Sequence, residues 1–235
     1  MAVNLSFQNA KILFCSKLGD KNCEKALRFL TQSCSNVAIC TGDWGDDIPP
    51  EMLSWSGDYI LSYMSKWIIP ESVLKRASSA AINFHPGPPS RPGAASVNYA
   101  LYDGDKEFGV TCHYMTSKVD SGKIIMTRKF PVFESDNVSS LLKRSHEELL
   151  ELFIEIVSTL KEGKDLPESA DTWNRENFHT RKDINGQLRR IPADISKEEL
   201  ERRIRATLFE NWKPYLAIHG IKFVMETGNR ETDNP

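Results

Sequence analysis

The chain has 235 residues, of which 26% are charged, and its acids and bases nearly cancel to a formal net charge of -2. This length accommodates one main domain with a small appendage, because single domains usually run to about 100–200 residues. The near-neutral balance excludes a global basic field that would gather nucleic acid or an anionic membrane, so a phosphate-bearing substrate would need a local pocket.

Strand-like and helix-like segments alternate through the first third of the chain. Short apolar runs suited to strands occupy residues 11–16, 36–41, 58–64 and 80–84. Apolar residues at helical spacing separate them at 23–33 and at 70–77, where Pro70 suits a first helical turn. Strands separated by helices predict a parallel sheet covered by helices on both faces.

A second series of elements follows the proline-rich loop. We expect a helix at 94–102, strands at 108–115 and 123–130 joined by a turn, and a long amphipathic helix at 135–160. The composition then becomes polar, so we divide the chain into a main α/β domain at 1–165 and a small α+β extension at 166–235. The extension should hold a charged helix at 196–208 and a hairpin within 215–224, turning at His219-Gly220.

Polar side chains stand where the predicted fourth strand ends, in the sequence INFHPGPPSRPG. Asn83 and His85 are two residues apart, so they point to the same side of a strand. Ligands of many α/β folds bind outside the carboxyl ends of strands, where an amide can hold an oxyanion and an imidazole can move protons. The alternative is that both side chains only satisfy backbone groups of the loop, and these two residues alone leave both interpretations open.

The loop VDSGKII supplies a carboxylate at Asp120. A carboxylate near a histidine would orient the ring and favour its protonated form. By itself, Asp-Ser-Gly is also an ordinary turn sequence. His113 lies in the preceding predicted strand without a second metal ligand nearby, so we expect packing or a surface position for it and no metal site. Trp44 would either stack on a base or pterin or seal a loop.

The cellular compartment is predicted from targeting patterns and from the use of cysteine. No segment approaches the ~20 apolar residues that span a bilayer, and the first residues lack the pattern of a secretory signal. The five cysteines form an odd set without a C-x-x-C pair. We therefore expect a soluble, cytoplasmic protein with reduced cysteines that pack as small hydrophobes. No nucleotide-binding glycine motif is present, so nicotinamide and P-loop chemistry find no support.

Residues 80–125 resemble the core of the 10-formyltetrahydrofolate-dependent formyltransferases. The similar features are Asn-x-His-Pro at 83–86, a Pro/Gly loop, a helix ending in an Ala-Leu-Tyr-Asp-Gly-Asp turn, Gly-Val-Thr at 109–111 and Asp-Ser-Gly at 120–122. Their order and spacing match together, which is more specific than any single segment. The loop Gly-Pro-Pro-Ser-Arg-Pro-Gly departs from the Leu-Leu-Pro-x-Tyr-Arg-Gly loop of many members, and Arg91 is the residue that matches their arginine.

This resemblance implies a Rossmann-like domain that uses 10-formyltetrahydrofolate as co-substrate and needs no metal. The implied catalytic set is Asn83, His85 and Asp120, with Asn83 and protonated His85 stabilising the oxyanion and Asp120 orienting His85 and helping to remove the amine proton. The implied folate-binding residues are Met64, Trp67, Ile68, Ile69, Pro70, Val119 and Gly122. The implied acceptor-binding residues are Pro88, Arg91, Gly93 and Tyr99.

The carboxy-terminal extension resembles that of the sugar N-formyltransferases, in which an Ile-Arg-Ala segment, here residues 204–206, precedes a short hairpin. The resemblance implies a GDP- or dTDP-linked amino dideoxy sugar as acceptor, for O-antigen of lipopolysaccharide or another surface polysaccharide, and a homodimer formed through the extension. A tRNA acceptor is not expected, because this chain lacks the residues of a tRNA-binding domain and the positive charge that RNA demands. Two alternatives stay open: formylation of another small amine, such as glycinamide ribonucleotide or a carrier-bound amino acid, or a non-catalytic folate- or nucleotide-binding protein.

Overall fold

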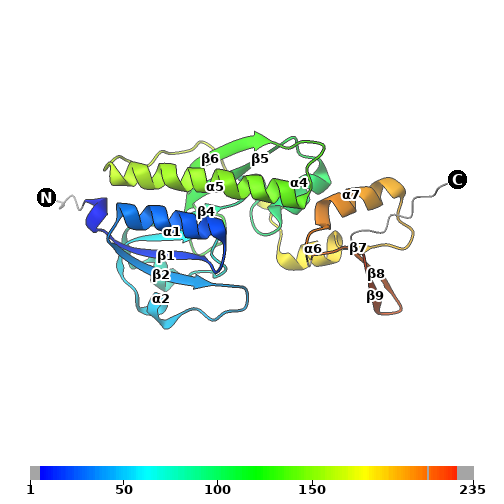
Figure 1. Ribbon diagram of the computed structural model, residues 1–235, viewed down its shortest axis with the longest axis horizontal. Helices are drawn as coiled ribbons and strands as arrows, with labels where there is room; N and C mark the ends of the chain where they lie inside the picture. Colours follow the sequence, from blue (N-terminus) through cyan, green and yellow to red (C-terminus); the bar gives the residue numbers. More distant parts are fainter. Residues whose placement is uncertain (1–5, 211, 227–235) are drawn as a thin grey trace.

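A six-stranded, mostly parallel sheet forms the centre of the main domain (Figure 1). The computed structural model describes residues 6–210 and 212–226. The strands, in the spatial order β2-β1-β3-β4-β5-β6, are β1 Lys11–Lys17, β2 Asn36–Gly42, β3 Gly57–Tyr63, β4 Ala77–His85, β5 Glu107–Tyr114 and β6 Ile124–Pro131. Strands β1 to β4 run parallel, whereas β5 pairs antiparallel with both β4 and β6. The predicted α/β class is confirmed.

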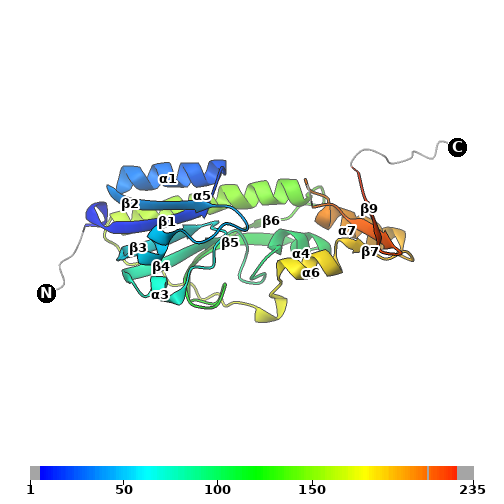
Figure 2. The ribbon, with the colours of Figure 1, turned by 90° about the horizontal axis from the view of Figure 1, so that it is seen from below.

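Helices cover both faces of this sheet, as predicted (Figure 2). Helices α1 Lys21–Ser33 and α5 Val138–Lys161 lie side by side on one face, and the short helices α2 Pro50–Ser54 and α3 Glu71–Leu74 lie on the other. Alternate residues of β1 divide between the two cores. Phe14 packs with α5 through an edge contact to Phe153, with ring centroids 6.0 Å apart, whereas Leu13 packs in the cluster that holds Met52 and Val73.

The largest boundary error concerns the segment before β4. We predicted a helix at 70–77 and a strand at 80–84, but α3 ends at Leu74 and β4 begins at Ala77. Gly57 of β3 pairs with Ala77, so sheet pairing extends β4 toward the amino terminus and leaves a single helical turn. The predicted helix at 135–160 begins at Val138, because Asn137 and Ser140 form a capping box there.

The extension contains more structure than its sequence predicted. Besides α7 Lys197–Thr207 and the hairpin of β8 Tyr215–Ile218 and β9 Ile221–Val224, it holds α6 Arg181–Gln187 and the two-residue strand β7 Arg190–Ile191. The hairpin turns at His219 and Gly220, whose φ angles of 48° and 82° are both left-handed, as a two-residue turn of this kind requires. Helix α4 Ser96–Asp103 joins the extension to the sheet by packing against α7.

The cysteines are all free and buried. Burial raises the pKa of the Cys23 thiol to about 12 and that of Cys15 further, so these thiols stay protonated and unreactive at neutral pH. This confirms the structural role predicted for them. Within the part of the chain that the structure describes, no helix is both long enough and apolar enough to cross a membrane.

Candidate active site

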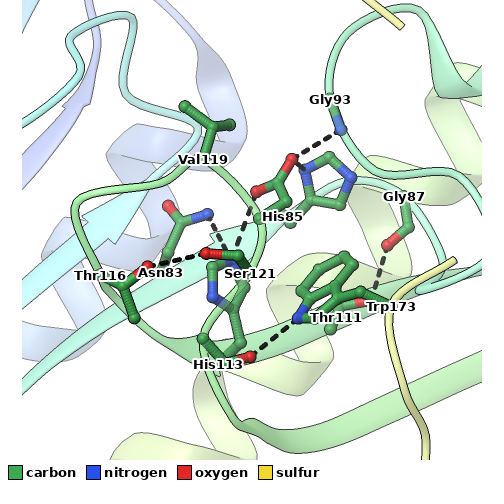
Figure 3. Close-up of polar contacts among 12 residues, drawn as sticks. Asn83, His85, Gly87, Gly93, Thr111, His113, Thr116, Val119, Ser121 and Trp173 are labelled. Carbon is green, nitrogen blue, oxygen red and sulfur yellow. Dashed lines mark hydrogen bonds and ion pairs between the residues drawn. The ribbon is translucent and has the colours of Figure 1, made fainter. Parts of the chain in front are cut away.

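The candidate site lies at the carboxyl end of β4, where the parallel strand delivers Asn83 and His85. Strand β5 runs antiparallel beside it, and the pairing sets His113 opposite Asn83 and Thr111 opposite His85. The side-chain amide nitrogen of Asn83 lies 3.1 Å from Nε2 of His113 (Figure 3). The sheet register therefore adds a second histidine to the pair predicted from the sequence.

A buried carboxylate joins the two histidines. Asp120, in the loop between β5 and β6, places Oδ2 3.5 Å from Nδ1 of His85 and Oδ1 3.4 Å from Nε2 of His113. The backbone N–H of Gly93 donates a hydrogen bond of 2.8 Å to the same carboxylate. The structure thus brings Asn83, His85 and Asp120 together, although they come from two separate segments of the chain.

Electrostatics set the resting charge of this cluster. Burial opposes ionisation of Asp120, but the attraction of His85 and His113 and the Gly93 N–H outweigh it and lower the pKa of the carboxyl to about 2. Burial lowers the pKa of His85, repulsion from His113 lowers it further, and attraction by Asp120 offsets only part of this. At neutral pH the site holds a carboxylate and a neutral His85, so the protonated His85 expected from the sequence is not the resting form.

His113 has a place in the site that its sequence context did not reveal. We predicted packing or a surface position, and the side chain is packed at only 3% exposure, but it lies between Asn83 and Asp120. Its Nδ1 lies 2.8 Å from the carbonyl oxygen of Tyr114, to which it donates a hydrogen bond, and this orients Nε2 toward the other two side chains. Only the pairing of β4 with β5 reveals the role of His113, because it places this residue directly opposite Asn83.

The proline-rich loop closes one wall of the site. Gly87 packs so closely that an added Cβ would lie 2.6 Å from Nε2 of His85. Thr111 and Ser145 donate hydrogen bonds of 2.7 and 3.0 Å to the carbonyl oxygens of Gly87 and Pro86. Pro88 lines a cavity of about 320 Å³ behind this loop, bordered also by Glu107, Lys129 and Asp171.

Two residues expected to contact the acceptor have other partners. The Arg91 guanidinium is buried and pairs with Asp103 and, at 2.7 and 2.9 Å, with Asp105. The Tyr99 hydroxyl donates a hydrogen bond of 2.9 Å to Gln187, and its ring stacks on His179 at 3.6 Å. Arg91 thus fixes the proline-rich loop to the turn after α4, and Tyr99 fixes α4 to the extension, while their contact with an acceptor stays a prediction.

The residues expected to bind folate lie in two loops, one that follows β3 and one between β5 and β6. Met64, with a left-handed φ of 55°, turns the chain after β3, and Ile69 is buried in the core beneath Pro70, so only its backbone is available to a ligand. Ile68 and Val119 expose apolar side chains, at 70% and 39%.

Two further residues of these loops have protein partners. Trp67 donates a hydrogen bond of 2.9 Å to the carbonyl oxygen of Asp46, and the Gly122 carbonyl accepts one of 2.8 Å from Trp173. Trp173 comes from the extension, and its ring meets His85 and His113 edge-on, with centroids 6.0 and 5.0 Å apart (Figure 3).

Metal ligation has no candidate cluster in residues 6–210 and 212–226. No group of three or more His, Cys, Asp or Glu side chains lies close enough together there to hold a metal ion.

Known proteins similar to this chain are formyltransferases. Residues 48–157 match the family described as Formyl transferase, so this part of the chain is similar to a formyl transferase domain. Methionyl-tRNA formyltransferase of Listeria welshimeri is 34% identical over 115 residues, which are 48% of this chain and 37% of that protein. The chain therefore aligns with well under half the length of this curated relative.

Solved structures extend the similarity of fold into the extension. A 4-N formyltransferase from Francisella tularensis superposes with a TM-score of 0.73 at 17% identity, covering 94% of this chain and 98% of that one. An N-formyltransferase from Helicobacter canadensis, determined with folinic acid and dTDP-3-aminofucose, gives a TM-score of 0.69 at 19% identity, covering 90% and 85%. The chain therefore shares the fold of these two N-formyltransferases over nine-tenths or more of its length.

Proposed function

We propose that this protein transfers a formyl group from 10-formyltetrahydrofolate to the amino group of a nucleotide-linked amino dideoxy sugar. The observation that carries the proposal is the buried cluster in which an ionised Asp120 faces a neutral His85, with the amide of Asn83 on the same strand end. The match of residues 48–157 to the formyl transferase family supports the reaction class.

Each residue of the cluster has a role in this transfer. The amine attacks the formyl carbon, and the electrons of the carbonyl bond move to oxygen, where the Asn83 amide donates a hydrogen bond to the oxyanion. Neutral His85 accepts the proton of the attacking amine, and Asp120 stabilises the imidazolium that forms. When the intermediate collapses, the bond from carbon to N10 breaks and His85 returns the proton to N10, giving tetrahydrofolate and the formamide.

We propose that the folate lies over the loops that carry Ile68 and Val119. Their exposed apolar side chains suit an aromatic ring system, and Met64, Trp67, Pro70 and Gly122 complete the loops. The Helicobacter canadensis structure, determined with folinic acid, supports a folate ligand for this fold.

A cationic and aromatic cluster supports a phosphate-bearing acceptor. Nζ of Lys66 lies 4.9 Å from the centroid of the Trp44 ring, and the Arg181 guanidinium carbon lies 3.7 Å from it. Burial, with the charges of Lys17 and Arg181, lowers the pKa of Lys66 to about 8. Lys17, Lys66 and Arg181 form no ion pair among the described residues. The negative charge of Asp43 partly offsets the positive charges of Lys66 and Arg181. A phosphate would relieve this repulsion, and the half-exposed Trp44 ring can stack on a base.

The acceptor is tested by release of tetrahydrofolate from 10-formyltetrahydrofolate with a panel of amines. We expect release with GDP- or dTDP-linked amino sugars and none with glycinamide ribonucleotide or methionyl-tRNA. Lys66→Ala should raise KM for the nucleotide sugar about 10- to 100-fold, because a charge-assisted contact is lost, and leave KM for the folate unchanged. Lys75→Ala, at an exposed lysine paired with Glu71, is the matched control.

Other outcomes of this panel support the alternatives. Release of tetrahydrofolate only with glycinamide ribonucleotide or a carrier-bound amino acid would show that the acceptor is another small amine. Absence of release with every amine would favour a non-catalytic folate- or nucleotide-binding protein.

We also propose that the hairpin of β8 and β9 pairs two copies of the chain. Four apolar side chains there, Ile218, Ile221, Phe223 and Val224, are 44% to 63% exposed, and β9 is an edge strand. An exposed apolar edge of this kind is typical of an interface. Sedimentation should give twice the chain mass for the wild type and the monomer mass for Phe223→Asp, and a monomeric wild type would contradict the proposal.

A further inference from the structure

The loop that carries the site carboxylate has an unfavourable backbone conformation. Asp120 has a φ of 45°, in the left-handed region that residues other than glycine seldom adopt. Such a conformation persists only where the surroundings impose it. The groups that hold this loop therefore decide where the Asp120 carboxylate points.

Ser121 holds the loop from within, because its hydroxyl donates a hydrogen bond of 2.9 Å to the Lys118 carbonyl, and further groups come from the extension. Nη1 of Arg175 donates hydrogen bonds of 2.9 and 2.8 Å to the carbonyl oxygens of Val119 and Asp120. Nε1 of Trp173 donates one of 2.8 Å to the carbonyl oxygen of Gly122. Carbonyl groups on both sides of the Asp120 side chain are thus fixed by two residues about 50 positions further along the chain.

The segment that supplies them is itself anchored along the proline-rich loop. We call residues 171–179 the clamp segment. The backbone N–H of Asn174 donates to the Pro89 carbonyl at 2.9 Å, and the backbone N–H of Ala94 donates to the His179 carbonyl at 2.8 Å. The Arg175 guanidinium also stacks over the Phe178 ring at 4.4 Å. The clamp segment therefore joins the wall at 86–93 to the loop at 119–122.

The same segment touches the histidines directly. The Trp173 ring packs edge-on against His113 at an interplanar angle of 85° and against His85 at 69° (Figure 3). Trp173 thus contacts both histidine rings, and its indole N–H holds the loop of Asp120 through the Gly122 carbonyl.

We propose that Trp173 and Arg175 are positioning residues of the active site, which hold the 119–122 loop so that Asp120 faces His85 and His113. The inference rests on the proposed formyl transfer and adds a requirement to it: the extension is part of the catalytic apparatus.

Arg175→Ala is expected to lower kcat about 10- to 100-fold, because misplacement of a reacting group by about 1 Å has an effect of this size. KM for the acceptor should change less than threefold, and millimolar methylguanidinium should restore part of kcat. Trp173→Phe keeps a ring beside the histidines but removes the hydrogen bond to Gly122, so it should lower kcat by a smaller factor. Arg190→Ala, at an exposed arginine of the extension, is the matched control and should behave as wild type.

A second readout is independent of turnover. The chain has five histidines, so the His85 ring signal can be assigned by substitution and titrated by NMR. Asp120 raises the pKa of His85, whereas burial and His113 lower it. The pKa of His85 should therefore be lower in Arg175→Ala than in the wild type, because Asp120 is released, and should be unchanged in Arg190→Ala. This readout stands even if no acceptor is formylated by the wild type.

Arg175→Lys replaces the alanine variant if that variant fails to fold. Lysine keeps the charge but not the planar guanidinium, so kcat and the pKa of His85 should fall in the same direction by smaller amounts. Unchanged kcat and His85 pKa in both Arg175 variants and in Trp173→Phe would overturn the inference. Equal losses in Arg190→Ala would also overturn it, because the effect would then be a general one of the extension.

Discussion

His85→Ala is expected to lower kcat for formyl transfer about 10²- to 10⁴-fold, the usual contribution of a positioned acid-base group. Asn83→Ala should lower it about 10²- to 10³-fold, because a donor to the developing oxyanion is lost. Asn83 is only half-buried, so Asn83→Ala should change the melting temperature little, whereas His85→Ala should lower it, because the buried Asp120 carboxylate loses the attraction of His85. Release of tetrahydrofolate at saturating acceptor measures the effect.

His219→Asn is the control for these variants, because His219 is exposed in the hairpin turn and asparagine tolerates its φ of 48°. Wild-type turnover in either Asn83→Ala or His85→Ala would show that the proposed roles are wrong.

The pH dependence of kcat gives a further check on His85. Because the active form is the neutral imidazole, kcat should fall as the pH drops through the pKa of His85, which burial places below the ordinary value of 6.5. Asp120→Asn removes the attraction that raises this pKa, so the acid limb should move to lower pH while kcat also declines. A wild-type limb above 6.5 would contradict a neutral resting His85.

Gly122→Ala is the second substitution with a large expected effect. The added Cβ would overlap the carbonyl oxygen of Tyr114 and lie 3.3 Å from Cγ2 of Thr116. The Tyr114 backbone cannot easily retreat, because its N–H donates a hydrogen bond of 2.9 Å to the carbonyl of Lys123. The loop of Asp120 must therefore move.

This displacement should lower the free energy of unfolding by about 1–3 kcal/mol, the usual effect of overpacking, and lower kcat about 10²-fold. Urea unfolding and turnover measure the two effects. Gly186→Ala is the matched control: nothing lies near its Cβ position, and it sits in α6, so alanine should stabilise the protein by about 0.4–1 kcal/mol. Gly122→Ala with wild-type stability and turnover would show that the loop tolerates a side chain.

Local sequence patterns were sufficient to predict the position of a residue where that position depends only on its own segment of the chain. The alternation along β4 placed Asn83 and His85 on one side, and the resemblance to the formyltransferases pointed to Asp120. The His-Gly pair predicted the hairpin turn, because both positions need left-handed backbone. Arg91 shows the opposite case: its motif position suggested an acceptor contact, and its pairing with Asp103 and Asp105 becomes visible only in the folded chain.

Periodicity and motifs within short stretches of chain were enough to predict the α/β class, the strand that ends in Asn83 and His85, and the formyltransferase resemblance. The position of His113 opposite Asn83, and the contacts of Trp173 and Arg175 with the loop of Asp120, become visible only in the folded chain. Strand register and contacts between residues some 50 positions apart depend on how whole elements pack, and no local pattern encodes that packing.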